Sequence, residues 1–463
     1  MPAGDRYPVT HMAKRFVIIG GGPAGNTAAT YAARFGAEVT MIESDVVGGA
    51  AHLRDCIPSK AMIATGDALG RINDAHRMGL TDVAASLDFS ALRTRISEIS
   101  ARLEKSTTSL LQSQGVNIIH GRGRMLDAHT VGVTTAEGEQ HVEADVVLIA
   151  TGSRPRIPEW ATVDHRRMLT TRDAYPPVEL PEHLVVIGSG VTGVEFVHMF
   201  SSFGCEVSLI VSRQQVLPLK DPEVAAALEQ DFLARGVNLL KGAKAVTATV
   251  TDNDITIECT DGRVVSGSHA LLAIGSLPNT ENLGLEALGV EMNGGYVSVD
   301  HNCLSSVKHI YAAGDVSGKL PLSSVASLQG RKIAEHAMGL HVGPHRHIDY
   351  EKAASAIFTE PEIADVGLAE ADAFAEGRKI RVTKVPFSAN AKALIEDDPR
   401  GFVKIISDPA TGVVLGGSIV GRHAAELISV VALAVNSGLR VADLHESLFV
   451  HPSMAEALTD AAE

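Results

Sequence analysis

Two stretches of this chain, far apart in the sequence, follow the pattern Gly-x-Gly-x-x-Gly, and each lies between two apolar β-type runs. The first begins at residues 15–19 and ends, after an Ala-rich stretch, in a β run that closes on Glu43. The second begins at residues 184–187 and ends in a β run that closes on Val211. Strand, glycine turn, helix and strand form the fingerprint of a dinucleotide-binding α/β unit. Two such units predict two bound dinucleotides, and the simplest enzyme holding two redox dinucleotides passes a hydride between them.

Each glycine of the first turn has an expected task. Gly20 permits the turn, Gly22 lets the backbone approach a pyrophosphate, and Gly25 lets the helix pack closely on the strand. Pro23 and Ala24 open the helix, whose N-terminal N–H groups and dipole favour the pyrophosphate. Glu43 is expected to bind the adenosine ribose hydroxyls, and the alternative is a solvated carboxylate at a strand end.

The second turn differs from the first where its second strand ends. Gly188, Gly190 and Gly193 repeat the spacing, with Val191 and Thr192 between them. Val211 stands where an acid would receive a ribose 2′-hydroxyl, and Ser212 and Arg213 follow it. Loss of the acid removes repulsion against a 2′-phosphate, and Arg213 could attract one, so the sequence favours NADPH, or use of both coenzymes, over strict use of NADH. The alternative for Arg213 is an ordinary surface cation.

Composition excludes several classes of partner. The formal charge of −15 argues against nucleic acid or an anionic membrane, since both require basic patches. Four cysteines stand far apart without metal-ligand spacing, which predicts a reduced, cytoplasmic protein with no metal site. We also expect no signal peptide, no membrane span and a disordered lead-in over residues 1–13.

The segment from Gly48 to Lys60 resembles the redox segment of the flavoprotein disulfide reductases, in which two cysteines five residues apart form a disulfide beside the flavin. Here Cys56 matches the second cysteine, whereas Ala51 occupies the position of the first. The resemblance covers residues 14–460. It implies a homodimer with an α/β fold of two Rossmann-like dinucleotide-binding domains and a C-terminal α+β dimerisation domain. The implied FAD-binding domain takes in residues 14–155 and 275–345, and the implied NAD(P)-binding domain takes in residues 156–274. The implied interface domain takes in residues 346–463.

Further positions match the parts of that family that contact the flavin. Asp315, in the run Ala312-Ala313-Gly314-Asp315, is expected to hydrogen-bond the ribityl chain, and Ser323 falls near the flavin's phosphate or pyrimidine side. The other residues that the resemblance places at the cofactors are Gly49, Ala50, Lys60, Gly123, Thr151, Gly152, Gly275 and Gly314.

The resemblance also implies which residues carry the chemistry. Lys60 and Glu195 match a charged pair at the inner face of the flavin, near its N5, and the alternative is a helix–helix salt bridge. His451 and Glu456 match the histidine that crosses the dimer interface and the glutamate that orients it, and the alternative is an interface contact. Cys56 could persist as a thiolate that tunes the flavin, as a packing residue, or in a disulfide with a distant cysteine.

Because a single thiol cannot form the redox disulfide, the resemblance is strongest to the LpdA-type NAD(P)H:quinone reductases. It implies a ping-pong reaction from NAD(P)H through FAD to a quinone or a similar small acceptor. Two alternatives remain open at this stage. One is soluble pyridine-nucleotide transhydrogenation, and the other is a nucleotide-bound redox-sensing or structural subunit without turnover.

Overall fold

The computed structural model describes residues 13–340 and 347–463. Most of the expected N-terminal lead-in, residues 1–12, lies outside the described residues. The chain divides into two compact units, and each is considered by itself. The first unit takes in residues up to 54, 100–154 and 277–348, and the second takes in 55–99, 155–276 and 349–463. The domain ranges expected from the sequence remain a prediction.

The first unit is built on a five-stranded parallel sheet. The predicted run at 15–19 is its central strand, which pairs with the predicted second run (Phe16 with Val39) and with a later strand (Phe16 with Val146). In spatial order the strands are β20 (Ile310–Ala312), β7 (Val146–Ile149), β1 (Arg15–Ile19), β2 (Glu38–Glu43) and β3 (Asn117–His120).

The two faces of this sheet bury different partners, because successive side chains of a strand point to opposite faces. Phe16 and Ile18 pack with the alanines of α1 (Pro23–Arg34). Val17 and Ile19 pack instead against a three-stranded antiparallel sheet. That sheet comprises β4 (Arg122–Met125), β5 (Thr130–Thr135) and β6 (Gly138–Glu143), and a short hairpin of β18 (Met292–Asn293) and β19 (Tyr296–Val297) belongs to the same unit.

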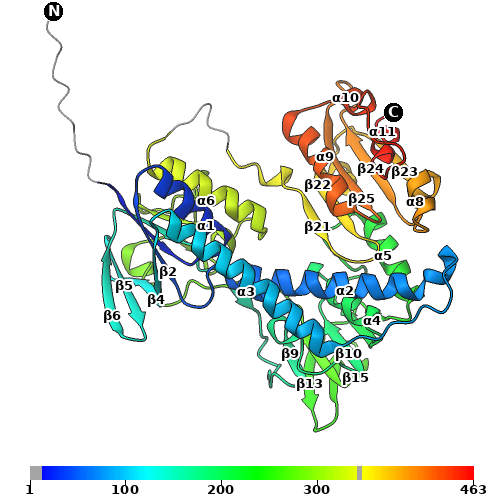
Figure 1. Ribbon diagram of the computed structural model, residues 1–463, viewed down its shortest axis with the longest axis horizontal. Coiled ribbons are helices and arrows are strands. Elements are labelled where there is room, and N and C mark those ends of the chain that lie inside the picture. Colours follow the sequence, from blue (N-terminus) through cyan, green and yellow to red (C-terminus); the bar gives the residue numbers. More distant parts are fainter. Residues whose placement is uncertain (1–12, 341–346) are drawn as a thin grey trace, which may run out of the picture. The chain divides into compact units, whose positions relative to one another are not determined.

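Helix α1 lies beside α6 (Ser323–Ala337), as the neighbouring blue and yellow-green helices of Figure 1 show. The contact is close because Gly330 faces the backbone of α1: a Cβ there would lie 2.1 Å from the Ala24 carbonyl oxygen. The two helices that begin at predicted cofactor segments therefore form one layer.

The second unit contains a second five-stranded parallel sheet. Residues 184–187 again supply the central strand, with Leu184 paired to Val207 and to His269. The spatial order is β12 (Asn238–Lys241), β11 (Glu206–Val211), β10 (His183–Ile187), β16 (His269–Leu272) and β9 (Met168–Thr170).

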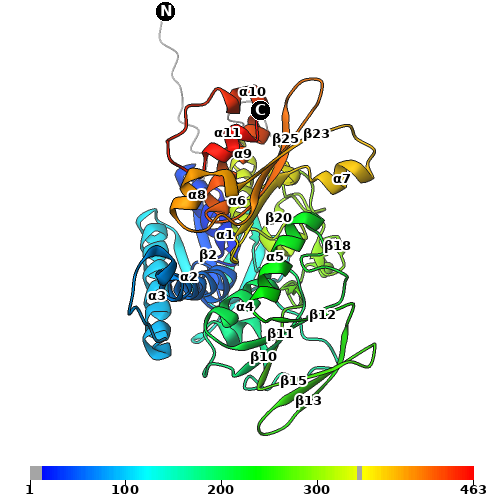
Figure 2. The same ribbon diagram turned by 90° about the vertical axis from the view of Figure 1, so that its right-hand side faces the viewer.

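The faces of this sheet are covered in the same way as those of the first. Leu184 and Val186 pack with Phe196 of α4 (Val191–Ser202), in a core that α5 (Pro222–Ala234) also enters. Val185 and Ile187 face a second antiparallel sheet, labelled at the foot of Figure 2. Its strands are β13 (Ala245–Val250), β14 (Ile255–Cys259) and β15 (Val264–Gly267).

The C-terminal part of the second unit is an antiparallel sheet with α9 (Ala424–Ser437) packed on β22 and β25 (Figure 1). The strand expected near 401–406 and the helix expected near 424–435 are both present, as β24 and α9. The strand order is β21 (Ser355–Ile357), β22 (Ile363–Gly367), β25 (Val414–Val420), β24 (Phe402–Ser407) and β23 (Arg381–Pro386).

Helix α2 (Ile57–Asn73) follows a π-helical segment at Ala51–Cys56 and packs on α4. The remaining helices and paired strands are α3 (Phe89–Ser113), α7 (Glu370–Ala375), α8 (Ala391–Ile395), α10 (Val441–His445), α11 (Glu456–Asp460), β8 (Ser153–Pro155) and β17 (Ser276–Pro278). Among the described residues, every helix is too short or too polar to cross a membrane.

Candidate active site

The two glycine turns have nearly identical backbone geometry. Gly20 and Gly188 both adopt a φ of +110°, which favours glycine. A Cβ on Gly25 would lie 2.1 Å from the Gly20 carbonyl oxygen, and one on Gly193 would lie 1.9 Å from that of Gly188. Both turns therefore need glycine at the positions that the fingerprint assigns to turning and to helix packing.

The middle glycine of each turn leaves a helix N-terminus available for an anion. Gly22 caps α1 and Gly190 caps α4, each without a side-chain hydrogen bond to the first-turn N–H groups. A Cβ on Gly190 would meet no atom within 4 Å, and one on Gly22 would meet only the Cα of Gly49 at 3.9 Å. Uncapped N–H groups beside open space fit a dinucleotide pyrophosphate.

Glu43 ends β2 as a buried carboxylate. Its Oε2 accepts a hydrogen bond from the Gly21 N–H at 2.6 Å, and its Oε1 accepts one from the Asp45 N–H at 2.7 Å. Each carboxylate oxygen can accept a further bond. The arrangement fixes the side chain beside the glycine turn, and its contact with a ribose remains a prediction.

Other predicted flavin positions lie near this turn or on the strands beside it. Gly49, at φ +86°, approaches Gly22 so closely that a Cβ would lie 2.6 Å from the Gly22 Cα, and Ala50 follows it. Gly123 lies in β4, where a Cβ would press on Ile19 at 3.0 Å, so its smallness serves packing there.

A second polar group of the first unit lies around Asp315, which accepts a hydrogen bond from the Ser153 hydroxyl. The Gly314 N–H donates to the Gln329 side chain at 2.7 Å, so both residues of this predicted motif are fixed. Ser323 begins α6. Ser153 could not be selected from sequence patterns, because its link to Asp315 spans 162 residues.

Thr151 and Gly152 are held by a loop from later in the chain. The Thr151 hydroxyl donates to the Asn279 carbonyl oxygen at 2.6 Å, and the Asn279 amide donates to the Thr151 carbonyl oxygen at 3.0 Å. The Asn279 N–H also donates to the Gly152 carbonyl oxygen. Gly275, in the second unit, has a φ of +91° and accepts a bond from the Arg156 N–H at 3.0 Å.

The predicted coenzyme-selective positions are exposed. Val191 and Thr192 open α4 with accessible side chains, and Ser212 and Arg213 follow the buried Val211 at the end of β11. The Arg213 carbonyl oxygen accepts the Gly242 N–H, which fixes its backbone and leaves the guanidinium at the surface. An exposed cation beside the second glycine turn is available to a 2′-phosphate.

Lys60 and Glu195 form the ion pair that the sequence predicted, with 2.8 Å between Nζ and Oε2. The Glu195 side chain is 4% exposed and that of Lys60 29%. The Phe358 N–H donates to the other Glu195 oxygen at 3.0 Å, and the Phe358 ring centroid lies 4.9 Å from Lys60 Nζ. Helix α2, helix α4 and the segment at Phe358 thus hold the Lys60 ammonium in place. Its carboxylate partner, Glu195, is almost completely closed to water.

The thiol at Cys56 is half-buried and favours its neutral form. Burial raises the pKa of Cys56, and Glu195 and Asp55 add to the shift that Lys60 opposes. Desolvation is the largest of these effects and disfavours a thiolate, and the choice among the three roles expected for Cys56 remains a prediction. The Ser59 hydroxyl donates to the Cys56 carbonyl oxygen at 2.8 Å, which ties the residue to the first turn of α2.

Tyr175 is a neighbour of this group that the sequence did not predict. Its ring stacks on Phe196 with 4.6 Å between centroids, and its hydroxyl is near Ser59. Burial, with Glu195 adding to the effect, holds the pKa of Tyr175 well above its usual range, so it stays a neutral phenol. An aromatic residue in a loop carries no pattern that distinguishes it from an ordinary core residue.

His451 and Glu456 form the second predicted pair, with 2.8 Å between Nδ1 and Oε1. The His451 side chain is 74% exposed. The Ser453 N–H donates to Glu456 at 2.9 Å, and this bond together with His451 lowers the pKa of Glu456. The glutamate is therefore a carboxylate at neutral pH that orients an exposed imidazole. In the part of the chain that the structure describes, no hydrogen bond joins this pair to Lys60 or Glu195.

Two models of one protein family match nearly the whole chain. Residues 14–330 match the pyridine nucleotide-disulphide oxidoreductase model, and residues 353–462 match the dimerisation domain of the same group. The chain belongs to this family. As a pyridine nucleotide-disulphide oxidoreductase it uses FAD and NAD(P)H, which confirms the predicted fold class and cofactors.

Similar proteins include both quinone and lipoyl enzymes. The chain is 42% identical to a Mycobacterium tuberculosis protein named NAD(P)H dehydrogenase (quinone), over 97% of this chain and 94% of that protein. It is 33% identical to dihydrolipoyl dehydrogenase of Bacillus subtilis, over 96% of each. The crystal structure of LpdA from Mycobacterium tuberculosis matches with a TM-score of 0.92 and 41% identity, over 97% of this chain and 99% of that one.

A further similar structure is the HOCl-induced flavoprotein disulfide reductase RclA from Escherichia coli, with a TM-score of 0.85 and 25% identity. The match covers 97% of this chain and 99% of that one. Within the pyridine nucleotide-disulphide oxidoreductases, this chain is therefore a member that has Cys56 in its cysteine segment and Ala51 five residues before it.

Proposed function

We propose that the protein transfers reducing equivalents from NAD(P)H through FAD to a quinone or a similar small acceptor, without a redox disulfide. The observation that carries the proposal is the combination of Ala51, which removes one thiol, with an intact Lys60–Glu195 ion pair. Similarity to a protein named as a quinone dehydrogenase supports the choice of acceptor.

In this proposal the chain's own residues bind and orient the reactants. The N-termini of α1 and α4 bind the two pyrophosphates through the backbone at Gly22 and Gly190. Bound FAD supplies the two-electron redox chemistry. Lys60, fixed by Glu195, provides a positive charge that favours charge development on the hydride acceptor.

The second pair would manage protons. Reduction of a quinone consumes two protons as well as two electrons, and an imidazole titrates near neutral pH. Glu456 holds Nδ1 of His451, which leaves Nε2 to donate a proton to a quinone oxygen. We also infer a homodimer, because the residues matched to the dimerisation domain expose large apolar side chains such as Leu433, Leu448 and Val450.

The first experiment is anaerobic reduction of the purified flavoprotein by NADPH, followed by separate additions of menadione, lipoamide and NAD⁺. Bleaching of the flavin by NADPH and reoxidation by menadione alone is the expected result. Reoxidation by NAD⁺ alone would identify a transhydrogenase instead, and fast reoxidation by lipoamide would require a second reactive thiol. No bleaching would favour a sensing or structural subunit.

Arg213→Gln is expected to raise the KM for NADPH about tenfold and to leave that for NADH unchanged. A charge-assisted contact with the 2′-phosphate contributes about 1.5 kcal/mol, which corresponds to about tenfold in affinity. Steady-state kinetics with both coenzymes checks the prediction. Arg263→Gln, at another exposed arginine of the same unit, is the control. An equal change for NADH and NADPH would contradict a role in coenzyme selection.

His451→Gln is expected to slow reoxidation of the reduced flavin by menadione about 10²-fold, the lower range for general acid catalysis, because water can partly replace an exposed imidazole. The rate of flavin reduction by NADPH should not change. Stopped-flow measurement of the two half-reactions separates them, and His445→Gln serves as the control. Unaltered reoxidation across the pH range would remove His451 from the mechanism.

A further inference from the structure

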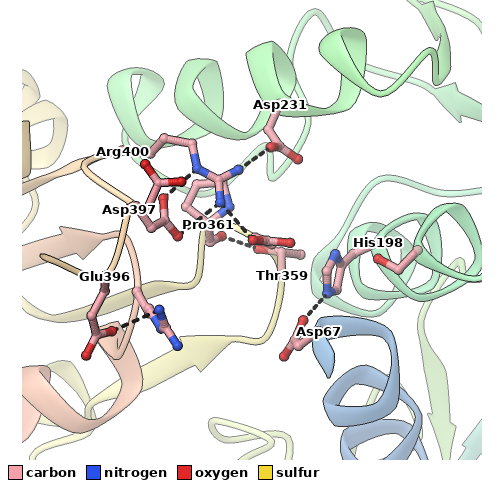
Figure 3. Close-up of polar contacts among 12 residues, drawn as sticks. Asp67, His198, Asp231, Thr359, Pro361, Glu396, Asp397 and Arg400 are labelled. Atoms are coloured by element: carbon pink, nitrogen blue, oxygen red, sulfur yellow. Dashed lines mark hydrogen bonds and ion pairs between the residues drawn. The ribbon is translucent and has the colours of Figure 1, made fainter. Parts of the chain in front are cut away.

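Helices α2 and α4 are joined by polar contacts at two levels. Lys60 of α2 meets Glu195 of α4, and farther along both helices Asp67 meets His198, with 3.1 Å between Oδ1 and Nε2 (Figure 3). The helices also approach closely near the second level, since a Cβ on Gly66 would lie 3.0 Å from the Ser202 side chain. His198 is completely buried, one turn along α4 from Glu195.

The hydrogen bonds of His198 fix its protonation. The two terminal nitrogens of Arg235 lie 3.1 Å and 3.2 Å from Nδ1 of His198. A guanidinium only donates hydrogen bonds, so Nδ1 accepts and the ring proton is on Nε2. Nε2–H then donates to Asp67. The imidazole is neutral, and both of its nitrogens have partners.

Arg235 carries the connection onward to the segment that contacts Glu195. Its terminal nitrogen donates to the Glu360 carbonyl oxygen at 2.8 Å, and Asp231 holds the same guanidinium at 2.5 Å. Two residues before Glu360, the Phe358 N–H donates to Glu195. The segment 358–360, which follows β21, is therefore fixed to both α4 and Arg235.

A second arginine, Arg400, also binds the segment 358–360. Arg400 contacts the Glu360 carboxylate at 2.7 Å and Asp231 at 2.9 Å, the latter drawn in Figure 3. Asp231 thus receives both arginines and holds them against residue 360. The route from Asp67 to the Glu195 carboxylate runs entirely through direct hydrogen bonds and one short stretch of backbone.

The chemistry of the cluster favours this positioning role over a metal site. One ligand atom each of Asp67, His198 and Glu360 lie within 4.8 Å of one another, which is close enough for a shared cation. A metal at Nε2 would need the lone pair there, and Nδ1 would then carry the proton. The guanidinium of Arg235 donates to Nδ1 and excludes that tautomer. A proton occupies the place that a metal would take.

We propose that Asp67, His198 and Arg235, here called the His198 network, position Glu195 and through it the Lys60 ammonium for hydride transfer. The proposal rests on the function proposed above only in assigning Lys60 and Glu195 to the flavin. The network contacts no reacting atom in this scheme. It fixes the register of α2 on α4 and the direction of the Phe358 N–H, and so determines where the cation lies.

The test is a double-mutant cycle between the network and the ion pair. His198→Phe fills the buried volume and removes both hydrogen bonds, and is combined with Glu195→Gln. We expect His198→Phe to slow flavin reduction by NADPH about tenfold when Glu195 is present, and less than twofold in the Glu195→Gln background. Asp67→Asn alone, which keeps an acceptor for the Nε2–H of His198, should retain most of the wild-type rate. Equal slowing in both backgrounds, or none in either, would overturn the proposal.

A matched control and a second readout keep the result interpretable. His269 is another buried histidine of the same unit beside a carboxylate, with 3.5 Å to Glu179, and His269→Phe should leave the rate unchanged. The flavin midpoint potential, measured by dithionite titration, should fall in His198→Phe but not further in the double variant. This readout needs neither NADPH nor quinone, so it tests the network even if the proposed reaction fails. Addition of Zn²⁺ should leave the wild-type potential unchanged, and a saturable shift would favour the metal site instead.

Discussion

Lys60→Met is expected to slow reduction of the flavin by NADPH on the order of 10³-fold, the upper range for loss of one preorganised charge at an active site. The reason is that Lys60 is the cation of a pair whose partner is 4% exposed, in a place where solvent screens charge weakly. Anaerobic stopped-flow reduction gives the rate directly. The affinity for NADPH should change much less, because the ammonium acts on the hydride acceptor and not on the dinucleotide.

The Lys60→Met variant leaves Glu195 buried with only the Phe358 N–H, and part of its effect could be loss of folded protein. Glu195→Gln avoids this, because the amide oxygen still accepts from Phe358 and Lys60, 29% exposed, can turn to water. We expect it to slow reduction about 10²-fold with little change in thermal stability.

Arg77→Met is the control for these variants. It breaks an exposed ion pair with Asp397 just beyond the end of α2, where little effect is expected. Wild-type reduction rates in both Lys60→Met and Glu195→Gln would mean that the ion pair only joins two helices, the alternative that the sequence left open.

The glycine turns could be predicted from sequence because their requirements are local. A carbonyl oxygen about 2 Å from where a Cβ would be leaves only glycine at Gly25 and Gly193, whatever the rest of the chain does. The flanking strands could be predicted equally well, since β1 and β10 are short apolar runs buried on both faces. The order strand, helix, strand of β1, α1 and β2 could therefore be predicted from the sequence alone.

The rest of the site depends on contacts between distant segments, which spacing does not encode. Lys60 and Glu195 are 135 residues apart and were found only by resemblance to a family. His198 lies in an almost wholly buried helix, so its pattern is that of a core position, and its partner Asp67 is 131 residues away. The protonation of Cys56 likewise could not be predicted from spacing, because the fold sets its burial, which raises the pKa of the thiol against the opposing charge of Lys60.

Gly190→Ala is expected to raise the KM for NADPH on the order of 10²-fold without loss of folded protein. The φ of −73° suits alanine, and the added Cβ meets no protein atom within 4 Å. The methyl group instead takes space that a pyrophosphate needs to reach two N–H groups, and loss of about 3 kcal/mol of such contacts corresponds to about 10²-fold. Coenzyme titration monitored by flavin bleaching gives the affinity, and thermal unfolding reports stability.

Two matched glycine variants make this prediction specific. Gly22→Ala is the same change at the first turn, with φ −74° and 3.9 Å to the nearest atom, and should weaken retention of FAD while the apoprotein still binds NADPH. Gly193→Ala forces a Cβ to within 1.9 Å of the Gly188 oxygen, so α4 must move, with an expected loss of about 3 kcal/mol in the free energy of unfolding. If Gly190→Ala lost FAD and Gly22→Ala lost NADPH affinity, the assignment of the two turns would have to be exchanged. If both left both cofactors bound as before, neither helix N-terminus would be the site of a pyrophosphate.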